Sequence, residues 1–464
     1  MDALIGSNFI VRNPTDELRQ WCAEHLVIDN PDYIKLTRMK KWTGNTPRYL
    51  QLYVRYGATN ETPEMLVLPF GCSDLLRQFP MPFKVLISPL RAVQYHPDIK
   101  LYPYQEEAVE AALKYKNGIL VMPCGAGKTI TGLSVIARIG GRALWLTHTQ
   151  DLLNQSLDKA KSIFNDDVKS YGTITAGKVN VGSSITFATI QTLAKVDLSD
   201  LKDAFDIIVV DECHHACGSP TRVTQFYKVL NAFSARYKYG LTATPKRADG
   251  LELSMFTLLG KVIHTVHKEA VENTTCPVVY RPIETGYFPN TGAVLAGDGT
   301  LNYAALIDDL THDEQRFQLV SNALNELDGI AIVLGNRVEY LQRLCDNYSG
   351  RAICLSTLGT SKSAKALRKN TLQKLNDGEL CCVFATYQLA KEGLDVPNLR
   401  YVVFSTPEKD ETTITQSAGR VGRKADGKDH GTVIDFVDDF GMYRGWYKKR
   451  VRYYKKMGAT EELN

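Results

Sequence analysis

The stretch Asn117–Ile139, NGILVMPCGAGKTITGLSVIARI, indicates the fold more directly than any other part of the sequence. Its first residues form an apolar run typical of a buried strand, and KTITGLSVIARI has the length and periodicity of a helix. A glycine-rich loop, Pro123-Cys124-Gly125-Ala126-Gly127, joins the two. A strand, a glycine-rich loop and a helix in this order predict a phosphate-binding loop in an α/β domain.

The residue types of this loop suit a nucleotide triphosphate. Its glycines allow the backbone to curl so that N–H groups face phosphate oxygens. Lys128 can reach the β- and γ-phosphates, and the hydroxyl of Thr129 can bind Mg²⁺. Met122 stands where the general pattern has glycine, and the surrounding strand and helix compensate for this departure. We therefore expect ATP and Mg²⁺ as cofactors.

Outward from this loop, apolar strands alternate with helices in two blocks. The first block contains the strands RALWLTH, SITFAT, DIIVVD and YKYGLTAT, and the second contains IAIVLG, RAICLS, LCCVFAT, RYVVFST and GTVIDFV. Continuous apolar strands alternating with helices predict parallel sheets covered on both faces. The fold class is therefore α/β, and the expected parts are a small N-terminal α+β domain (1–95), a first α/β domain (96–265), a linker region (266–305) and a second α/β domain (306–464).

A pair of adjacent carboxylates, Asp211 and Glu212, follows the strand DIIVVD. The carboxyl edge of a parallel sheet is where ligands bind, and two acids there are costly without a cation or a catalytic task. Asp211 suits a carboxylate that holds Mg²⁺, and Glu212 suits a general base that activates the attacking water. A solvated loop is the alternative, which the upstream phosphate-binding loop makes less attractive.

Asp-Glu-Cys-His at 211–214 resembles the DExH group of superfamily 2 helicases, and the resemblance extends from Leu101 to Arg423. It implies two tandem RecA-like motor domains and hydrolysis of ATP. Thr242-Ala243-Thr244 resembles the motif that couples nucleotide state to domain closure, and His214 would link the ATP site to it. Gln105 resembles the glutamine that reads adenine. Under this resemblance Cys213, the two histidines and Cys217 form no zinc site.

The second block carries matching motifs. Thr386 with Gly393 and Asp395 resembles motif V, and Gln416 to Arg423 resembles motif VI. Arg420 and Arg423 are three residues apart, which would place them on one helix face, and the resemblance implies that they reach the γ-phosphate from the second domain. Residues implied to contact the nucleic acid are Thr147, Gln155, Thr189, Thr192, Arg247, Arg337 and Thr386.

The N-terminal region differs from the two blocks in composition and in the pattern of its charges. From Tyr33 to Asn60 there is no acidic residue, and aromatic residues alternate with the cations Lys35, Arg38, Lys40, Lys41, Arg48 and Arg55. This composition predicts a surface that faces phosphates, with rings packing on sugars or unpaired bases. The aromatic residues of YLQLYVRY also suit an ordinary strand core, so both interpretations stay open. The basic run from Tyr443 to Lys456 is either a second DNA-facing element or a helix docked through its aromatic residues.

MPCGAGKT and GLTATPKRADG narrow the resemblance to XPB-like repair helicases and phage UvsW-type helicases. That group implies an ATP-dependent DNA motor that unwinds or branch-migrates forks, junctions and R-loops in replication, recombination or repair. The alternatives are an RNA helicase, a restriction-type translocase subunit or a binding protein that does not hydrolyse ATP.

The overall composition is compatible with such a protein, but it does not distinguish it from other globular proteins. The chain has 464 residues, 44% hydrophobic content, a net charge of +4 and ten scattered cysteines. It shows no signal-peptide pattern and no apolar run near the ~20 residues that span a bilayer. We therefore expect a monomeric cytoplasmic protein, in a bacterium or a phage-infected cell, with DNA as its partner.

Overall fold

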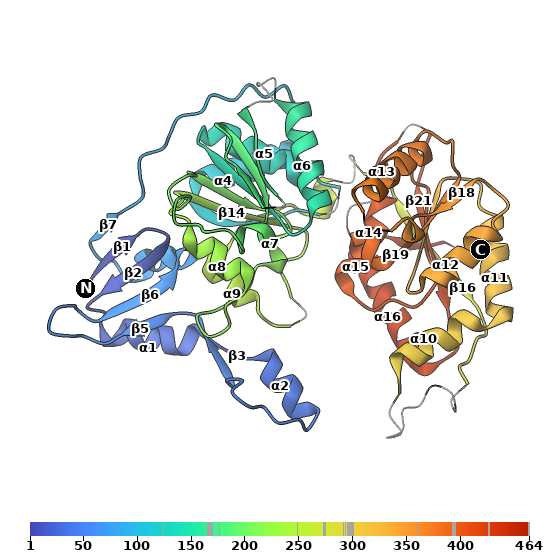
Figure 1. Ribbon diagram of the computed structural model, residues 1–464, viewed down its shortest axis with the longest axis horizontal. Helices are drawn as coiled ribbons and strands as arrows, with labels where there is room; N and C mark the ends of the chain where they lie inside the picture. The colour runs from blue at the N-terminus through green and yellow to red at the C-terminus, as the bar shows by residue number, and fades with distance from the viewer. Residues whose placement is uncertain are drawn as a thin grey trace. The chain divides into compact units, whose positions relative to one another are not determined.

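The computed structural model describes the whole chain except Cys124, 165–169, Ala176, Ala248, 272–274, Thr291, Ala293, 295–300, Thr360, 392–395, Asp426 and 463–464. The chain folds into two compact units. The first runs from Met1 to His267 apart from the loop 124–126, and the second contains Lys268–Asn464 (Figure 1). No helix among the described residues is long and apolar enough to cross a membrane.

The first unit is built around an eight-stranded sheet of order β11-β10-β12-β9-β13-β14-β8-β15. Every neighbouring pair is parallel except β10 and β11. The strands are β8 (Asn117–Val121), β9 (Ala143–Thr147), β10 (Gly172–Thr175), β11 (Lys178–Asn180), β12 (Ile185–Thr189), β13 (Ile207–Val210), β14 (Tyr237–Thr242) and β15 (Val262–Thr265). The helices are α4 (Pro103–Lys114), α5 (Lys128–Ile139), α6 (Gln150–Ile163), α7 (Ile190–Leu193), α8 (Gln225–Ala232) and α9 (Glu252–Leu259).

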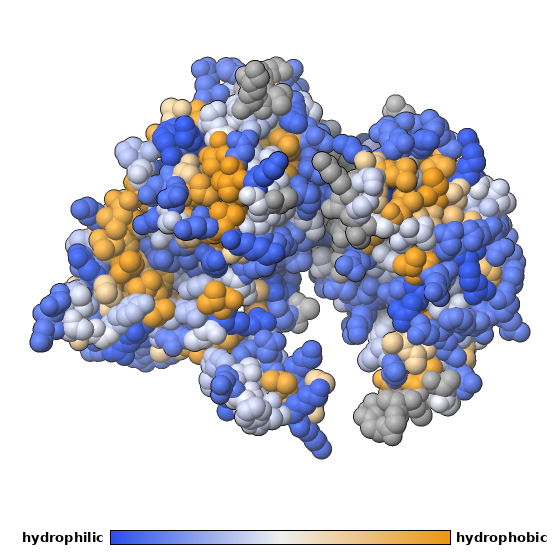
Figure 2. Space-filling model, viewed as in Figure 1, coloured by the Kyte–Doolittle hydropathy of each residue, from blue (hydrophilic) through white to orange (hydrophobic). Residues whose placement is uncertain are grey.

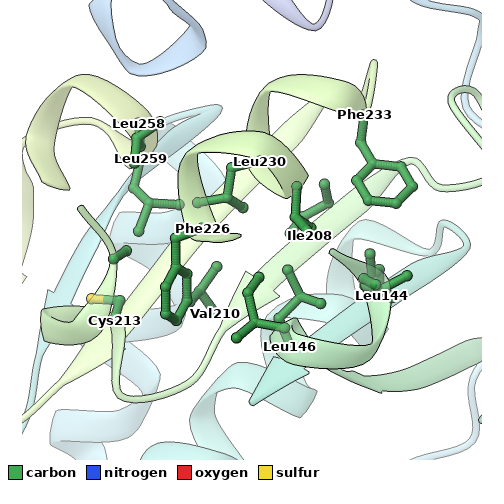
Figure 3. Close-up of a cluster of buried hydrophobic side chains, with 14 of the residues drawn as sticks. Leu144, Leu146, Ile208, Val210, Cys213, Phe226, Leu230, Phe233, Leu258 and Leu259 are labelled. Atoms are coloured by element: carbon green, nitrogen blue, oxygen red, sulfur yellow. The ribbon is translucent and has the colours of Figure 1, made fainter. Parts of the chain in front are cut away.

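Burial on both faces explains why these strands are apolar throughout. Every residue of β8, β9, β12 and β13 is buried. Figure 3 shows one of the two cores, in which side chains of β9 and β13 pack against α8 and α9. Cys213 lies in this core beside Phe226 and Leu259, so the turn that follows the acidic pair is anchored by apolar contacts.

The N-terminal domain has a five-stranded sheet of order β5-β6-β2-β1-β7, in which only β1 and β7 are parallel. Its elements are β1 (Asp2–Ile5), β2 (Asn8–Arg12), α1 (Asp16–His25), β5 (Val54–Tyr56), β6 (Met65–Pro69), η1 (Phe70–Asp74), α3 (Leu75–Gln78) and β7 (Phe83–Val85). The turn η1 packs closely on α9 of the motor sheet. A Cβ on Gly71 would lie 2.5 Å from the backbone of Thr257 and Gly260, so only glycine fits there.

A short arm interrupts the N-terminal domain between α1 and β5. It consists of β3 (Val27–Asp29), α2 (Pro31–Arg38) and β4 (Tyr49–Gln51), with β3 and β4 antiparallel. The run YLQLYVRY, expected as one strand, is therefore divided between β4 in the arm and β5, which pairs with β6. In Figure 1, α2 and β3 extend away from the rest of the N-terminal sheet.

The second unit contains a fully parallel sheet of order β18-β19-β17-β20-β21-β16-β22. Its strands are β16 (Val278–Glu284), β17 (Ala331–Gly335), β18 (Ala352–Cys354), β19 (Cys382–Thr386), β20 (Tyr401–Phe404), β21 (Gly431–Val437) and β22 (Thr460–Glu461). Its helices are α10 (Tyr303–His312), α11 (Glu314–Asn325), α12 (Val338–Asp346), α13 (Lys362–Asn376), α14 (Tyr387–Lys391), α15 (Glu411–Arg420) and α16 (Gly441–Lys456), with short turns η4 (Lys268–Ala270) and η6 (Leu355–Thr357).

One feature of this unit differs from the sequence-based expectation, and another bears on the two interpretations of the basic run 443–456. Residues 278–284, inside the expected linker region, form β16 and pair with β21 along their whole length. The basic helix α16 docks on its own domain, because Arg450 and Tyr454 are buried and both bond Asp435. Lys448, Lys449, Arg452, Lys455 and Lys456 stay exposed on its other side.

Candidate ATP site and nucleic-acid surfaces

The order of the first sheet brings three sequence motifs to one edge. β14 lies between β13 and β8, and all three run parallel. Because parallel strands end at the same edge, the glycine-rich loop after β8, Thr242 at the end of β14 and the acidic pair after β13 become neighbours. Segments that are far apart in the sequence thus form one site.

The glycine-rich loop has the backbone that a phosphate site requires. Gly125 and Gly127 have φ values of 84° and 77°, in the left-handed region where glycine is favoured. Gly127 is the N-cap of α5, so the first N–H groups of that helix open toward the loop. Cys124 lies outside the described residues.

Gln105, the residue expected to read adenine, packs against this loop. A Cβ on Gly127 would lie 2.4 Å from Nε2 of Gln105, so the amide covers the glycine directly. The side chain is 3% exposed, and its Oε1 accepts a 3.0 Å hydrogen bond from the backbone N–H of Tyr102. That bond fixes the orientation of the amide beside the loop.

Lys128 and the acidic pair form a buried charge cluster. The Nζ of Lys128 lies 3.6 Å from Oε1 of Glu212, and both side chains are almost fully enclosed. Glu212 has φ 48°, an uncommon value for a residue with a Cβ, and its N–H donates to Oδ1 of Asp211 at 2.9 Å. Strained backbone of this kind concentrates at functional sites.

The pKa values of the two carboxyl groups shift in opposite directions. Burial, together with the charge of Glu212, raises the pKa of Asp211. Burial also opposes ionisation of Glu212, but Lys128 and the nearby His214 lower its pKa below the usual range. The pair therefore carries an acid that gains from a bound cation beside a carboxylate that is ionised near pH 7.

These residues fit a Mg²⁺ nucleotide. The loop offers N–H groups and a space that a single Cβ would fill, Lys128 supplies a cation, and Asp211 with Thr129 supplies hard oxygen ligands. We assign Thr129 and Asp211 to the metal, and Pro123, Gly125, Ala126, Gly127 and Lys128 to the phosphates, as a proposal.

His214 connects the acidic pair to the Thr242 motif. Its Nδ1 lies 3.4 Å from Oε2 of Glu212 and 3.1 Å from the hydroxyl of Thr242. The Thr242 hydroxyl donates to the carbonyl of Thr244 and accepts from the N–H of Thr244, which closes a tight turn around Ala243. Among the described residues no group of three or more His, Cys, Asp or Glu side chains is placed so that it could hold a metal ion.

The motif residues of the second unit lie around the ends of β19 and α15. Thr386 ends β19 and accepts the N–H of Leu389, and the Nη2 of Arg420 donates to the carbonyl of Ala390 at 2.6 Å. Gly393 and Asp395 lie outside the described residues. Gln416 is half-buried on α15.

Arg423 is not placed as its spacing predicted. The helix α15 ends at Arg420, and Arg423 instead forms a β-bridge with Thr275. Gly422 lies between them, and with Gly419 it weakens the helix at this point. The two arginines therefore do not share a helix face.

Several candidates for nucleic-acid contact are engaged within the protein. Thr147 is 1% exposed and donates to the carbonyl of Thr149, and Thr189 is buried and bonds Thr192. Arg247 bonds Asp249 and the carbonyl of His214, so its structural role is to hold the loop after β14. Arg337 pairs with Asp308 at 2.6 Å, and Gln155 is half-buried on α6. By contrast, the N-terminal cations Lys35, Arg38, Lys40 and Lys41 are all exposed.

Comparison with known proteins gives the family. Residues 98–247 match the family described as type III restriction enzyme, res subunit, and residues 315–425 match the helicase conserved C-terminal domain. The chain belongs to the superfamily 2 helicases. These domains make it an ATP-hydrolysing helicase of a family that binds nucleic acid.

Individual relatives lie in several branches of this superfamily. A protein of Acanthamoeba polyphaga mimivirus named as an ATP-dependent RNA helicase is 26% identical over 366 residues, covering 77% of this chain and 68% of its own. The DNA 3'-5' translocase XPB2 of Sulfurisphaera tokodaii is 26% identical over 365 residues, covering 71% and 80%. The crystal structure of T4 UvsW matches 100% of this chain and 99% of its own, with 18% identity and a TM-score of 0.42.

Proposed function

We propose that this helicase is a DNA motor that unwinds or branch-migrates forks, junctions and R-loops. The observation that carries the proposal is the arm of the N-terminal domain, which presents cations and aromatic rings to solvent. Similarity to a DNA 3'-5' translocase supports DNA as the substrate.

The arm has the surface chemistry of a nucleic-acid grip. Trp42 is 89% exposed, so its ring is available to a partner. The exposed cations Lys35, Arg38, Lys40 and Lys41 directly precede it in sequence. Figure 2 shows hydrophobic residues among hydrophilic ones on this projecting segment. Phosphates would bind the cations, and a base at an unpaired or branched position would stack on the ring.

The N-terminal domain is firmly attached to the first motor domain. Besides the contact at Gly71, Arg222 pairs with Asp32 of the arm at 2.9 Å. The buried Lys238 of β14 donates to the carbonyl of Ser7. A motor domain that moves in each ATP cycle would therefore carry the arm with it.

The ATP-site residues have proposed roles that follow from their positions. Lys128 and the loop N–H groups hold the phosphates, and Glu212 takes the proton of the attacking water. Mg²⁺ held by Thr129 and Asp211 would supply positive charge that stabilises the developing phosphate charge. We propose that Arg420 and Arg423 act on the γ-phosphate from the second domain, and that Thr244, Thr386 and Gln416 link hydrolysis to the nucleic acid.

Two other substrates have some support. One relative is named as an RNA helicase, and the first domain matches a family of restriction-enzyme subunits. An RNA substrate would bind through the same contacts to the nucleic-acid backbone, so the distinction between DNA and RNA rests on the arm.

An unwinding panel tests the proposal. Forks, four-way junctions, R-loops, linear duplex DNA and duplex RNA are compared for wild type and for a variant with Lys35, Lys40 and Lys41 changed to Gln. We expect unwinding of branched DNA above duplex RNA, and a loss confined to branched substrates in the variant. A control variant, Lys178→Gln with Lys202→Gln, removes exposed cations elsewhere in the same unit. Preferred unwinding of duplex RNA by wild type would reject the DNA assignment.

A further inference from the structure

Three histidine rings form a continuous stack beside the ATP site. The rings of His214 and His215 have centroids 4.2 Å apart and are tilted by 43°. The ring of His215 in turn contacts that of His148, with centroids 4.3 Å apart and a tilt of 47°. These separations are at or below the short end of the usual range for aromatic pairs, so the rings are in direct contact.

The two ends of the stack belong to different parts of the site. At one end, His214 touches Glu212 and Thr242. At the other end, His148 follows directly after β9, and its carbonyl accepts a 2.7 Å hydrogen bond from Nε2 of Gln191 on α7. The stack therefore spans from the carboxylate proposed as general base to the loops after β9 and β12, where superfamily resemblance implies nucleic-acid contact.

Ring contact, rather than hydrogen bonding, holds the stack together. Nδ1 of His148 and Nε2 of His214 are buried and have no hydrogen-bond partner among the described residues. Buried polar atoms without partners are rare and costly, and each asks for an explanation. Burial also lowers the pKa of His148 and that of His215, so these two rings meet as neutral surfaces near pH 7.

Close packing makes the three rotamers interdependent. A shift of the β9–α6 loop moves His148, and His215 can follow only if its own turn, η3 (Cys213–His215), adjusts. That turn begins at the strained Glu212 and includes His214. Movement at the loop is thus passed to the residue that positions the carboxylate.

We propose that His148 and His215 are positioning residues that transmit nucleic-acid binding to Glu212 and so set the stimulation of ATP hydrolysis. The inference rests on the proposed function, because it needs a nucleic acid that accelerates hydrolysis. Sequence patterns gave no signal for either residue, since His148 follows an apolar strand and His215 lies outside the Asp-Glu-Cys-His motif.

The test measures the ratio of stimulated to basal ATP hydrolysis together with nucleic-acid affinity. For His148→Ala and for His215→Ala we expect the ratio to fall about fivefold or more, with the dissociation constant for the nucleic acid unchanged. Because both residues act in one stack, the double variant should lose no more than either single variant. His148→Phe keeps an aromatic ring and should restore most of the ratio.

The control variant is His25→Ala, which removes an exposed imidazole from the N-terminal domain. Thermal unfolding of each variant identifies any that fail to fold, and His148→Phe then decides. Additive losses, equal falls in basal and stimulated rates, or unchanged ratios would overturn the inference while leaving the proposed function standing. Absence of stimulation in wild type would overturn both, and is recognised before any variant is made.

Discussion

The ammonium group of Lys238 lies 3.2 Å from the carbonyl oxygen of Ser7, and this contact joins the central motor strand β14 to the N-terminal domain. The same group donates to the carbonyl of Leu230 at 2.8 Å and lies over the ring of Phe70. No carboxylate compensates it within these contacts. The lysine lies four residues before Thr242, so docking of the N-terminal domain and the coupling motif share one strand.

The burial of Lys238 predicts that the free energy of unfolding depends on pH. Burial lowers the pKa of Lys238 to about 7 from 10.5. Between these values the unfolded chain binds a proton that the folded chain does not, so the free energy of unfolding rises with pH, by at most about 1.4 kcal/mol per pH unit. Below pH 7 Lys238 is charged in both the folded and the unfolded chain, so the folded state bears the full cost of burying that charge. Urea unfolding between pH 7 and 9.5 measures the slope, and Lys238→Met should reduce it; an equal slope in the variant would contradict the assignment.

Removing the charge of Lys128 or that of Glu212 should stop ATP turnover, in each case for a different reason. Lys128→Ala removes the phosphate cation, so we expect both nucleotide binding and hydrolysis to fall. Glu212→Gln keeps the size of the side chain but removes the base, so nucleotide binding should persist while the rate falls by about 10² or more. Fluorescent-nucleotide binding and phosphate release separate the two effects. Substantial hydrolysis by Glu212→Gln would remove it as the base.

Gly127 tolerates no side chain. Gly127→Ala would place a Cβ 2.4 Å from Nε2 of Gln105 at a φ of 77°, so it should displace the amide and weaken ATP binding. Gln105→Ala should raise the KM for ATP more than that for GTP, because the resemblance assigns this amide to the recognition of adenine. Adding Gln105→Ala to Gly127→Ala relieves the clash but leaves the backbone strain, so recovery should be partial. Normal ATP affinity in Gly127→Ala would show that the loop adopts another backbone when nucleotide binds.

Arg423→Ala should retain ATP binding and lose hydrolysis, by about 10³ if the arginine acts on the γ-phosphate. Arg420 also bonds the carbonyl of Ala390, so Arg420→Ala should in addition destabilise α14, the helix that follows β19. Single-turnover hydrolysis and thermal unfolding of the two variants distinguish these effects. An unchanged kcat for Arg423→Ala would remove it from the site.

The ion pair between Arg450 and Asp435 is wholly buried, with two bonds of 2.8 Å. Asp435→Ala leaves an unpaired buried guanidinium, so we expect a loss of about 3–5 kcal/mol in the free energy of unfolding. The control Lys448→Ala changes an exposed cation on the same helix and should cost less than about 0.5 kcal/mol. Urea unfolding followed by circular dichroism gives both values.

Sequence patterns predicted the parts of the fold in which local composition and burial agree. The strands β8, β13 and β14 are short, mainly apolar runs that lead into the glycine-rich loop, the acidic pair and the Thr242 motif. The order of the sheet places these three segments side by side. The helical spacing of Arg420 and Arg423 was misleading because Gly422 permits the chain to leave the helix before Arg423.

Other features depend on contacts that a sequence does not display. Thr147 looks like any polar residue at a strand end, and only the carbonyl of Thr149 accounts for its burial. The strand β16 escaped prediction because VVYRPIE is partly charged and contains a proline. Pro282 is tolerated because β22 pairs only with Val279 and Tyr280, which leaves no partner strand for an N–H at Pro282 among the described residues.

The position of β16 also has a consequence for synthesis of the chain. This strand is the first of its sheet to leave the ribosome, yet its two neighbours, β21 and β22, are the last. The sheet of the second unit therefore cannot close until β21 and β22 have been synthesised, and β16 must remain unpaired while about 150 residues are added. A fragment begun at residue 306 would lack the strand between β21 and β22, so its edge would be open to pairing with other chains.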